Sequence, residues 1–294
     1  ETVNINRDEK RLKRIIKRFR PDLINCHTFY FFNFAKNLSQ LFHIPLVSTL
    51  HGMFLRFYGK DYASIIKDIC DKSDVVTVVS RNYKKEMTVR LCITGRNIHV
   101  IRNGVPPSKV NKIKSVLFRS NMNIPNDKKI VIVPARISKL KGFEYLMEAV
   151  KKMKKESFFF LICSPLGRHN EQESVFRNKL IKSFDSSGAL VRFIEYSHAD
   201  LQKAFSICDV CLLPSLAEGI SISILEAMEK SCFVIATDVG GNSEIIKNGI
   251  NGYLIKPKSI TGIVESLRSF ERMPSKMKAG IRKNAKKTVR TYFS

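Results

Sequence analysis

The chain has 294 residues, 44% of them hydrophobic and 26% charged, a composition typical of a globular protein with room for two domains. No apolar run approaches the roughly 20 residues of a transmembrane helix, and no signal-peptide pattern opens the sequence, which excludes a spanning helix within these residues. A total of 51 Lys and Arg against 26 Asp and Glu gives a formal net charge of +25, so anionic partners are favoured.

Predicted helices and strands alternate over the first part of the chain. We expect helices over residues 7–20, 31–42, 62–71 and 82–91, and strands over 21–26, 45–50, 74–80 and 98–102. The turn cluster Asn103-Gly-Val-Pro-Pro107 interrupts this alternation, and we therefore place the end of a first domain at residue 108.

The second part repeats the alternation more strongly. Its strands are nearly continuous in apolar residues, which is typical of a parallel sheet covered on both faces by helices, in the α/β fold class. We predict a second domain over residues 109–275 and a last helix over 276–294 that packs back toward the first domain. Strands are expected over 129–134, 158–163, 191–196, 209–213, 233–237 and 252–255, and helices over 143–154, 200–207, 222–230, 243–248 and 260–270.

Basic residues concentrate in two predicted helical segments, 10–20 and 282–290. In the first segment, Leu12, Ile15, Ile16 and Phe19 follow helical spacing and leave the basic residues on the outer face. Two interpretations stay open: a solvated face, or attraction to an anionic membrane surface, where each Lys or Arg contributes about 1 kcal/mol. The second interpretation predicts a peripheral protein at the inner face of a membrane.

The seven cysteines form no framework of disulfide spacings. Cys208 and Cys211 have the spacing of a metal or redox pair, but no second pair of Cys or His at zinc-site spacing accompanies them. We expect buried thiols that act as small hydrophobic side chains, in a reducing, cytoplasmic compartment.

The most informative segment runs from Pro214 to Met228. It follows the predicted strand 209–213 and contains a polar loop with a glycine, then a helix start, with Glu218 and Glu226 eight positions apart. An α/β sheet binds its ligand outside the carboxyl ends of its strands, where a helix start offers N–H groups and a positive dipole end to an anion. Carboxylates beside an anion site can accept hydrogen bonds from sugar hydroxyls. The segment therefore predicts a nucleotide-sugar site.

The second half resembles the donor domain of a GT-B glycosyltransferase of the retaining family four (glycosyl transferases group 1). Blocks at 135–142, 191–201, 218–226 and 237–252 match in the family's order, and weaker matches at 21–27, 48–52, 74–80 and 101–105 resemble the acceptor domain. The resemblance implies two Rossmann-like domains facing across a cleft.

The growing negative charge of a departing nucleoside diphosphate calls for fixed positive charge and N–H donors, and Arg136 and Lys141 are suited to supply the charge. The resemblance implies that Glu218 contacts the sugar and Glu226 the ribose. His51 would face the sugar, and His27 is a weaker candidate. We take Glu218, Arg136, Lys141 and His51 as the catalytic candidates and Gly219, Ile220, Ser221, Ile222, Glu226, Tyr196, Asn103, Gly240 and Gly241 as the donor-binding candidates.

The sequence departs from the family pattern at several positions, and further expectations follow from these differences. Many relatives have Phe-Gly where this chain has Ile220-Ser221, which points to an altered donor-sugar selectivity. Ser164-Pro-Leu-Gly167 and Glu195 replace residues on the nucleobase side. The family's first strand and glycine-rich loop have no counterpart before Arg7, so we expect an incomplete N-terminal domain and a chain trimmed at both ends.

The predicted activity is retaining transfer of a sugar from a nucleotide-sugar to a hydroxyl of a glycan or a lipid-linked glycan. No metal or other cofactor is expected, because no Asp-x-Asp motif stands out. A basic nucleic-acid-binding protein is the alternative from another class; net charge alone supports it and no nucleic-acid-binding motif does, so this partner is disfavoured. A catalytically degenerate member, and a sugar-phosphate synthase or phosphorylase on the same fold, stay open.

Overall fold

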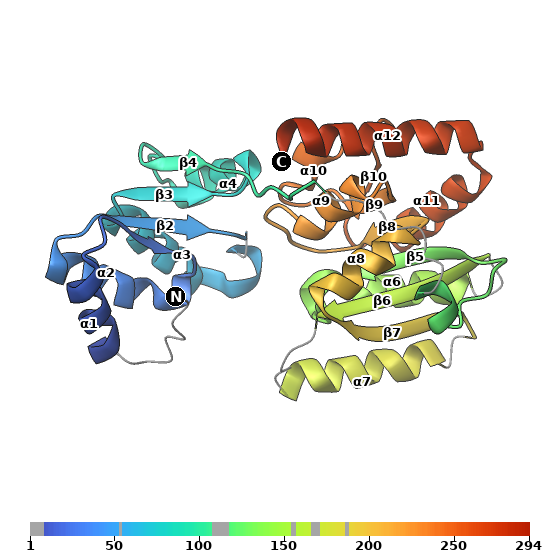
Figure 1. Cartoon of the computed structure of the whole chain (residues 1–294), viewed down its shortest axis with the longest axis horizontal. Coiled ribbons are helices and arrows are strands. Elements are labelled where there is room, and N and C mark those ends of the chain that lie inside the picture. Colours follow the sequence, from blue (N-terminus) through green and yellow to red (C-terminus); the bar gives the residue numbers. More distant parts are fainter. Residues whose placement is uncertain (1–8, 53–54, 108–117, 154–156, 166–170, 186–187) are drawn as a thin grey trace. The chain divides into compact units, whose positions relative to one another are not determined.

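The computed structural model describes residues 9–52, 55–107, 118–153, 157–165, 171–185 and 188–294. The chain divides into two α/β units, an N-terminal unit that ends at Arg102 and a C-terminal unit that begins at Asn103 (Figure 1). The predicted boundary at residue 108 lies outside the described residues. Both units are built on parallel sheets, which confirms the predicted fold class of two Rossmann-like domains.

The sheet of the N-terminal unit has the order β1-β2-β3-β4, so its strands follow one another in space as they do in the sequence. Alternating apolar residues of these strands pack with the helices into one core, in which Leu46, Ile66 and Val76 are fully buried. The strands are β1 (Ile24–Cys26), β2 (Leu46–Leu50), β3 (Val75–Val78) and β4 (Ile98–Val100), and the helices are α1 (Glu9–Phe19), η1 (Phe29–Phe31), α2 (Phe32–Phe42), α3 (Leu55–Lys72) and α4 (Arg81–Leu91).

The sheet of the C-terminal unit has the order β10-β9-β8-β5-β6-β7. This is the doubly wound order, in which the chain starts in the middle of the sheet and reverses direction once. The reversal lies between the neighbouring strands β5 and β8, which makes this point the expected ligand crevice. The strands are β5 (Lys129–Pro134), β6 (Phe158–Pro165), β7 (Val191–Tyr196), β8 (Val210–Leu213), β9 (Phe233–Thr237) and β10 (Tyr253–Ile255).

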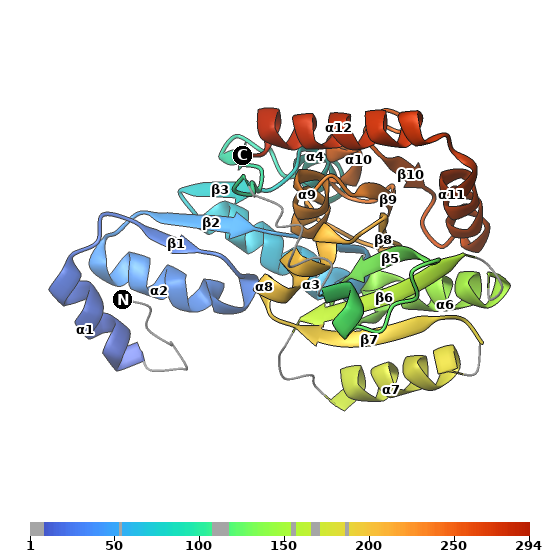
Figure 2. The same cartoon turned by 45° about the vertical axis from the view of Figure 1, so that its right-hand side comes forward.

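Helix α7 was not predicted from the sequence. Its Val175 is 64% exposed, whereas Leu180 and Phe184 are buried, so its apolar residues do not mark a single face in the sequence. Phe184 packs edge-on against Phe193 of β7, and Figure 2 shows α7 alongside that strand. The helices of this unit are η2 (Lys139–Lys141), α6 (Phe143–Lys152), α7 (Glu171–Asp185), α8 (His198–Ser206), α9 (Ile222–Glu229), α10 (Asn242–Ile245), α11 (Ile260–Arg272) and α12 (Ser275–Tyr292).

The last helix, α12, packs against α9 of its own unit. Ile281, Ala285 and Val289 form its buried stripe, and the buried carboxylate of Glu229 on α9 accepts hydrogen bonds from the guanidinium of Arg290. A return of this helix toward the N-terminal domain stays a prediction. Among the described residues, no helix combines the length and the apolar character needed to cross a bilayer.

Candidate functional site

The reversal between β5 and β8 brings two predicted site segments together. Arg136 and Lys141 follow β5, and Glu218 follows β8, so residues far apart in the sequence leave neighbouring strands at the same edge of the sheet. Connections from the two strands run to opposite faces of a doubly wound sheet, and a ligand crevice is expected between them.

An ion pair joins the two segments. The ammonium of Lys141 lies 2.6 Å from Oε1 of Glu218, and the hydroxyl of Ser215 donates a hydrogen bond to the same oxygen at 2.7 Å. Glu218 is 9% exposed, so its charge needs both partners. The sequence predicted a site role for Lys141 and Glu218, but it did not predict their mutual contact or the part played by Ser215.

Glycines fix how closely the loops approach one another. Gly142 and Gly240 both have positive φ, +68° and +54°. A Cβ atom on Gly142 would lie 2.0 Å from the carbonyl oxygen of Pro214, and one on Gly240 would lie 1.8 Å from the carbonyl oxygen of Glu218. Both the backbone angle and the lack of space therefore require glycine at these positions.

Backbone hydrogen bonds hold the same three loops together. The N–H of Leu216 donates to the carbonyl of Leu140 at 2.7 Å, and the N–H of Gly241 donates to the carbonyl of Gly219 at 2.6 Å. Main-chain groups make these two contacts, so the contacts themselves do not depend on the identity of the neighbouring side chains.

A buried polar network underlies the Glu218 loop. The hydroxyl of Thr237 donates to the carbonyl of Ser215 at 2.5 Å, and the side-chain amide of Asn242 donates to the carbonyl of Thr237 at 3.0 Å. Sequence reasoning missed Ser215, Thr237 and Asn242 as site residues, although Thr237 and Asn242 lie inside a matched block and Ser215 lies three residues before another. Their hydroxyl and amide groups satisfy buried carbonyls and carboxylate oxygens, so they support the loop from below.

The start of helix α9 borders the crevice. Ser221 is its N-cap, with a side-chain oxygen that accepts a hydrogen bond from the N–H of Ile224. N–H groups in the first turn of a helix have no partner within the helix, and the dipole there favours an anion. Ile220 is buried and Ile222 is half exposed, and the side-chain amide of Asn103 donates to the carbonyl of Ile220 at 3.4 Å.

Glu226 lies on α9 beyond this first turn. Burial raises the pKa of its carboxyl group, and Nδ1 of the exposed His198 lies 3.5 Å from Oε1 and favours the charged form. Tyr196, at the end of β7, is buried as well; burial is the main cause that raises the pKa of its phenol, and Glu226 adds to it. The phenol therefore stays a neutral hydrogen-bond donor.

Arg136 differs from Lys141 in its surroundings. Its guanidinium is exposed and forms no ion pair or hydrogen bond with the other residues that the structure describes. The structure thus places one predicted cation in a buried pair and leaves the other open to solvent at the same strand end. Across the described ranges, no group of three or more His, Cys, Asp or Glu side chains could hold a metal ion.

His51 and His27 meet in the N-terminal unit. They follow the neighbouring strands β2 and β1, and Nδ1 of His27 lies 2.9 Å from Nε2 of His51, with nearly parallel rings. Burial is the main cause that lowers the pKa of His51, and the charge of His27 lowers it further. They line a cavity of about 160 Å³ together with Thr28, Phe29, Thr49, Leu50, Gly52 and Tyr62.

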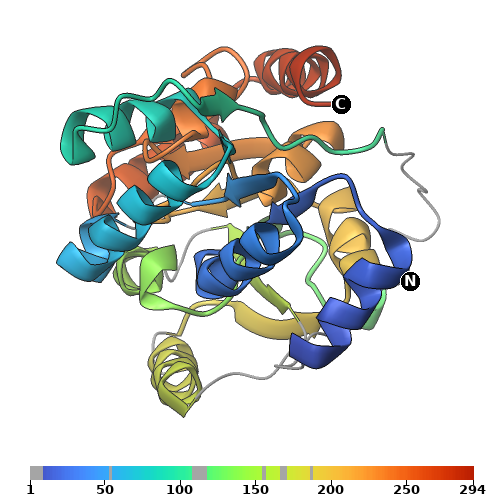
Figure 3. The ribbon, with the colours of Figure 1, turned by 90° about the vertical axis from the view of Figure 1, so that its left-hand side faces the viewer.

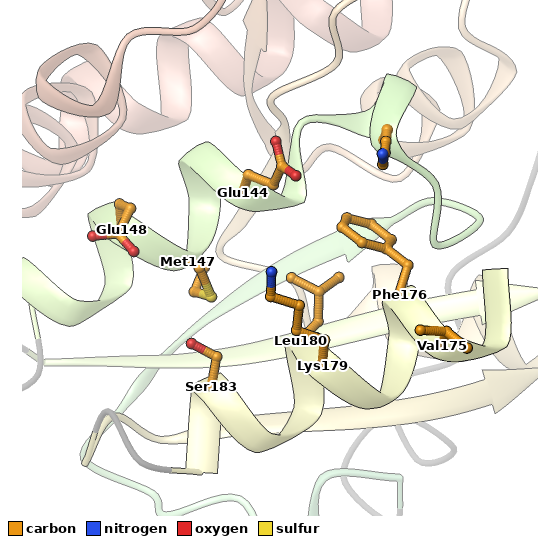
Figure 4. A pocket seen from close by; sticks show the side chains of 9 residues that line it. Glu144, Met147, Glu148, Val175, Phe176, Lys179, Leu180 and Ser183 are labelled. Carbon is orange, nitrogen blue, oxygen red and sulfur yellow. The ribbon is translucent and has the colours of Figure 1, made fainter. Parts of the chain in front are cut away.

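A larger cavity, of about 860 Å³, lies between α6 and α7 and contains none of the predicted site residues (Figure 4). Its lining mixes apolar side chains with Lys139 and Lys179 and with two carboxylates of α6. The sequence analysis did not find it because one wall is the missed helix α7. It is lined by Lys139, Glu144, Met147, Glu148, Val175, Phe176, Lys179, Leu180 and Ser183.

Comparison with models of protein families identifies the family of this chain. The model of the family "Glycosyl transferases group 1" matches residues 117–288, more than half of the chain, and that of "Glycosyltransferase Family 4" matches residues 4–109. The chain belongs to the glycosyl transferases group 1. The first of these two matches contains the Lys141–Glu218 pair and the loops around it.

Individual glycosyltransferases are similar to the chain at identities below 30%. An uncharacterized glycosyltransferase of Methanocaldococcus jannaschii is 26% identical over 250 residues, 81% of this chain and 63% of that protein. The N,N'-diacetylbacillosaminyl-diphospho-undecaprenol alpha-1,3-N-acetylgalactosaminyltransferase of Campylobacter jejuni is 29% identical over 186 residues, 63% of this chain and 46% of that protein. The chain thus spans less than two thirds of the length of these relatives.

Among solved structures, HepE of Anabaena in complex with UDP-glucose matches with a TM-score of 0.86 at 20% sequence identity. The match covers 96% of this chain and 78% of HepE. At this identity the likeness establishes the fold, which is that of a GT-B glycosyltransferase.

The close approach of Gly240 to the backbone of Glu218 leads to a first prediction. Gly240→Ala should lower the free energy of unfolding by about 2 kcal/mol more than Gly249→Ala, because the added methyl group forces the backbone at Glu218 to move. Gly249 is a matched control, since its φ is also positive (+76°) and a Cβ atom there would meet nothing within 4 Å. Urea denaturation of both variants measures the difference, and equal losses would contradict the close approach.

The histidine pair makes a second prediction. In an NMR titration, the pKa of His51 should lie below its ordinary value of about 6.5. In His27→Gln it should rise but stay below that value, because the repulsion disappears while the burial remains. His43→Gln, at the end of α2, is the control and should leave the pKa of His51 unchanged. An unchanged pKa in His27→Gln would show that the two rings are not neighbours in solution.

Proposed function

We propose that this chain is a retaining, nucleotide-sugar-dependent glycosyltransferase whose C-terminal unit binds the donor. The observation that carries the proposal is the Lys141–Glu218 pair at the reversal point of the sheet, a cation and a carboxylate in loops that approach closely at Gly142 and Gly240. Membership of the glycosyl transferases group 1 supports it.

The donor diphosphate is proposed to bind between Lys141, Arg136 and the first turn of α9. Two cations and a helix dipole would offset the charge that grows on the leaving diphosphate as the sugar–phosphate bond breaks. Glu218 holds Lys141 in a fixed position before the donor arrives, so little side-chain entropy is lost on binding. Gly219, Gly240 and Gly241 would let the backbone approach the phosphates, as only a glycine loop can.

The carboxylates and the buried phenol are proposed to recognise hydroxyl groups. Glu226 would accept a hydrogen bond from the ribose, Tyr196 would line the nucleoside side, and Glu218 would contact the transferred sugar. Asn103, Ile220, Ser221 and Ile222 would shape the sugar subsite, with Ile220-Ser221 setting its selectivity. HepE, whose solved complexes contain UDP and glucose or UDP-glucose, supports a donor of this chemical class.

Retention is proposed to occur by attack on the face that the diphosphate leaves. The departing diphosphate would take the proton of the acceptor hydroxyl, so no side-chain nucleophile is required. His51 is proposed to face the donor sugar as a neutral imidazole, in agreement with the burial that lowers its pKa. A neutral ring can accept or donate a hydrogen bond without attracting the diphosphate.

The proposed acceptor is a hydroxyl of a glycan or of a lipid-linked glycan at the cytoplasmic face of a membrane. The Campylobacter jejuni relative supports this choice, because its name describes a diphospho-undecaprenol acceptor. The net charge of +25 also favours an acceptor held at an anionic surface.

A panel of nucleotide-sugars tests the donor site. A donor that binds only the folded chain must raise its melting temperature. Lys141→Met should weaken donor binding about tenfold or more, because a charge-assisted contact is lost. Lys139→Met, which removes an exposed lysine of the same loop, is the matched control and should bind as the unmodified chain does.

Glu218→Gln tests the catalytic part of the same proposal. It keeps the shape of the side chain but removes its charge, so hydrolysis of the bound donor, in which water takes the sugar and nucleoside diphosphate is released, should fall about a hundredfold. The variant should still gain stability from the donor. Wild-type release in Glu218→Gln together with wild-type donor binding in Lys141→Met would overturn the assignment of the site.

A further inference from the structure

We propose that helix α1 and the adjoining amino-terminal edge of the N-terminal sheet form a docking surface for an anionic lipid bilayer. The proposal rests on the proposed function in one respect, since it names the surface that would bring the chain to a membrane-borne acceptor. The docking itself is measured without donor or acceptor. Figure 3 shows α1 at the edge of the N-terminal unit, on the side of α2 rather than that of α3 and α4.

The outer face of α1 is a stripe of positive charge. Lys10, Arg14 and Lys17 follow one another at spacings of four and three residues, which places them on one side of the helix, and all three are exposed. Arg18 and Arg20 are also exposed and continue the charge past the helix end. Such a stripe is the electrostatic complement of an acidic lipid surface.

The apolar face of α1 is only partly covered by the rest of the unit. Among its described side chains, Ile16 is buried, whereas Leu12 and Ile15 are partly exposed and Phe19 is 60% exposed. Leu12, Ile15 and Phe19 share one side of the helix, and the exposed Arg11 and Arg18 border this side. A helix with cations next to open apolar side chains is the pattern of an interfacial helix that lies in the plane of a bilayer surface.

Two further exposed leucines lie outside α1. Leu23 immediately precedes β1 and is 49% exposed, and Leu41, near the end of α2, is 54% exposed. Strands β1 and β2 pair in parallel with Ile24 opposite Leu46, so both leucines lie at the amino-terminal edge of the sheet. The His27–His51 cavity lies at the carboxyl-terminal edge of the same strands, and docking would leave its lining uncovered.

The apolar part of the surface favours a bilayer over nucleic acid. Phosphate groups of DNA or RNA would engage the cations of α1 but would leave Leu23 and Leu41 in water. A bilayer offers anionic headgroups to the cations and acyl chains to the leucines and Phe19. Among the side chains that the structure describes, Asp22 is the exposed acid closest in sequence to the stripe, and the described cations of α1 outnumber it.

Vesicle co-sedimentation of the full chain tests the proposal. The chain should sediment with vesicles of phosphatidylcholine containing about a third phosphatidylglycerol and stay in solution with phosphatidylcholine alone, since anionic headgroups attract the stripe. Reversing the charges in Arg14→Glu/Lys17→Glu/Arg18→Glu should lower partitioning about a hundredfold or more. The matched control, Lys283→Glu/Lys287→Glu on the exposed face of α12, should lower it much less.

A second variant isolates the apolar part. Phe19→Ser/Leu23→Ser/Leu41→Ser keeps every charge and should lower partitioning about tenfold or more, because the anchoring side chains are lost. Circular dichroism of each variant confirms that it is folded. Equal partitioning of this variant and the unmodified chain, or an equal loss in the α12 control, would overturn the proposal.

Two further outcomes separate this proposal from its alternatives. Binding to duplex DNA that depends on the α1 cations, with no binding to the anionic vesicles, would identify nucleic acid as the partner and overturn the proposal. Vesicle binding that follows the expected pattern in a chain that no nucleotide-sugar stabilises would support the docking surface and contradict the proposed transferase function instead.

Discussion

The buried carboxylate of Glu218 is the constraint on which the rest of the site depends. Burial of a carboxylate that is 9% exposed is costly without hydrogen-bond and ion-pair partners, and Lys141 and Ser215 supply them. These partners come from the loops after β5 and β8, so the loops must approach closely, and that approach requires glycine at positions 142 and 240. The charge of the site thus requires the close approach of the loops, and the close approach requires the glycines.

The order of the strands decides where such a site is able to form. In the C-terminal unit the reversal between β5 and β8 sends the following helices to opposite faces, and the crevice lies between their starts. In the N-terminal unit the described strands follow the order of the sequence without a reversal, and the pair of histidines gathers at the ends of two adjacent strands instead. The two units therefore place different chemistry at their strand ends, cations and carboxylates in one and a pair of imidazoles in the other.

The sequence predicts much of this fold because its buried strands are almost wholly apolar and its turn signals are clear. Lys129–Pro134 and Phe233–Thr237 have the same bounds in the structure as in the prediction. Helix α7 could not be predicted, because Val175 is exposed and Leu180 is buried, so its apolar residues do not mark one face at helical spacing. The site residues could be named from matched blocks, but the Lys141–Glu218 contact and the His27–His51 pair depend on strand order, which no local pattern encodes.

The central claim is that Lys141 and Glu218 form the diphosphate side of a nucleotide-sugar pocket. Calorimetric titration of the chain with a nucleoside diphosphate and the matching monophosphate tests it most directly, in the unmodified chain and in Lys141→Met. The account predicts that the variant loses about tenfold or more in affinity for the diphosphate and changes little for the monophosphate, because only the second phosphate needs this cation. An equal affinity of both proteins for the diphosphate, or an equal loss for both ligands, would contradict the account.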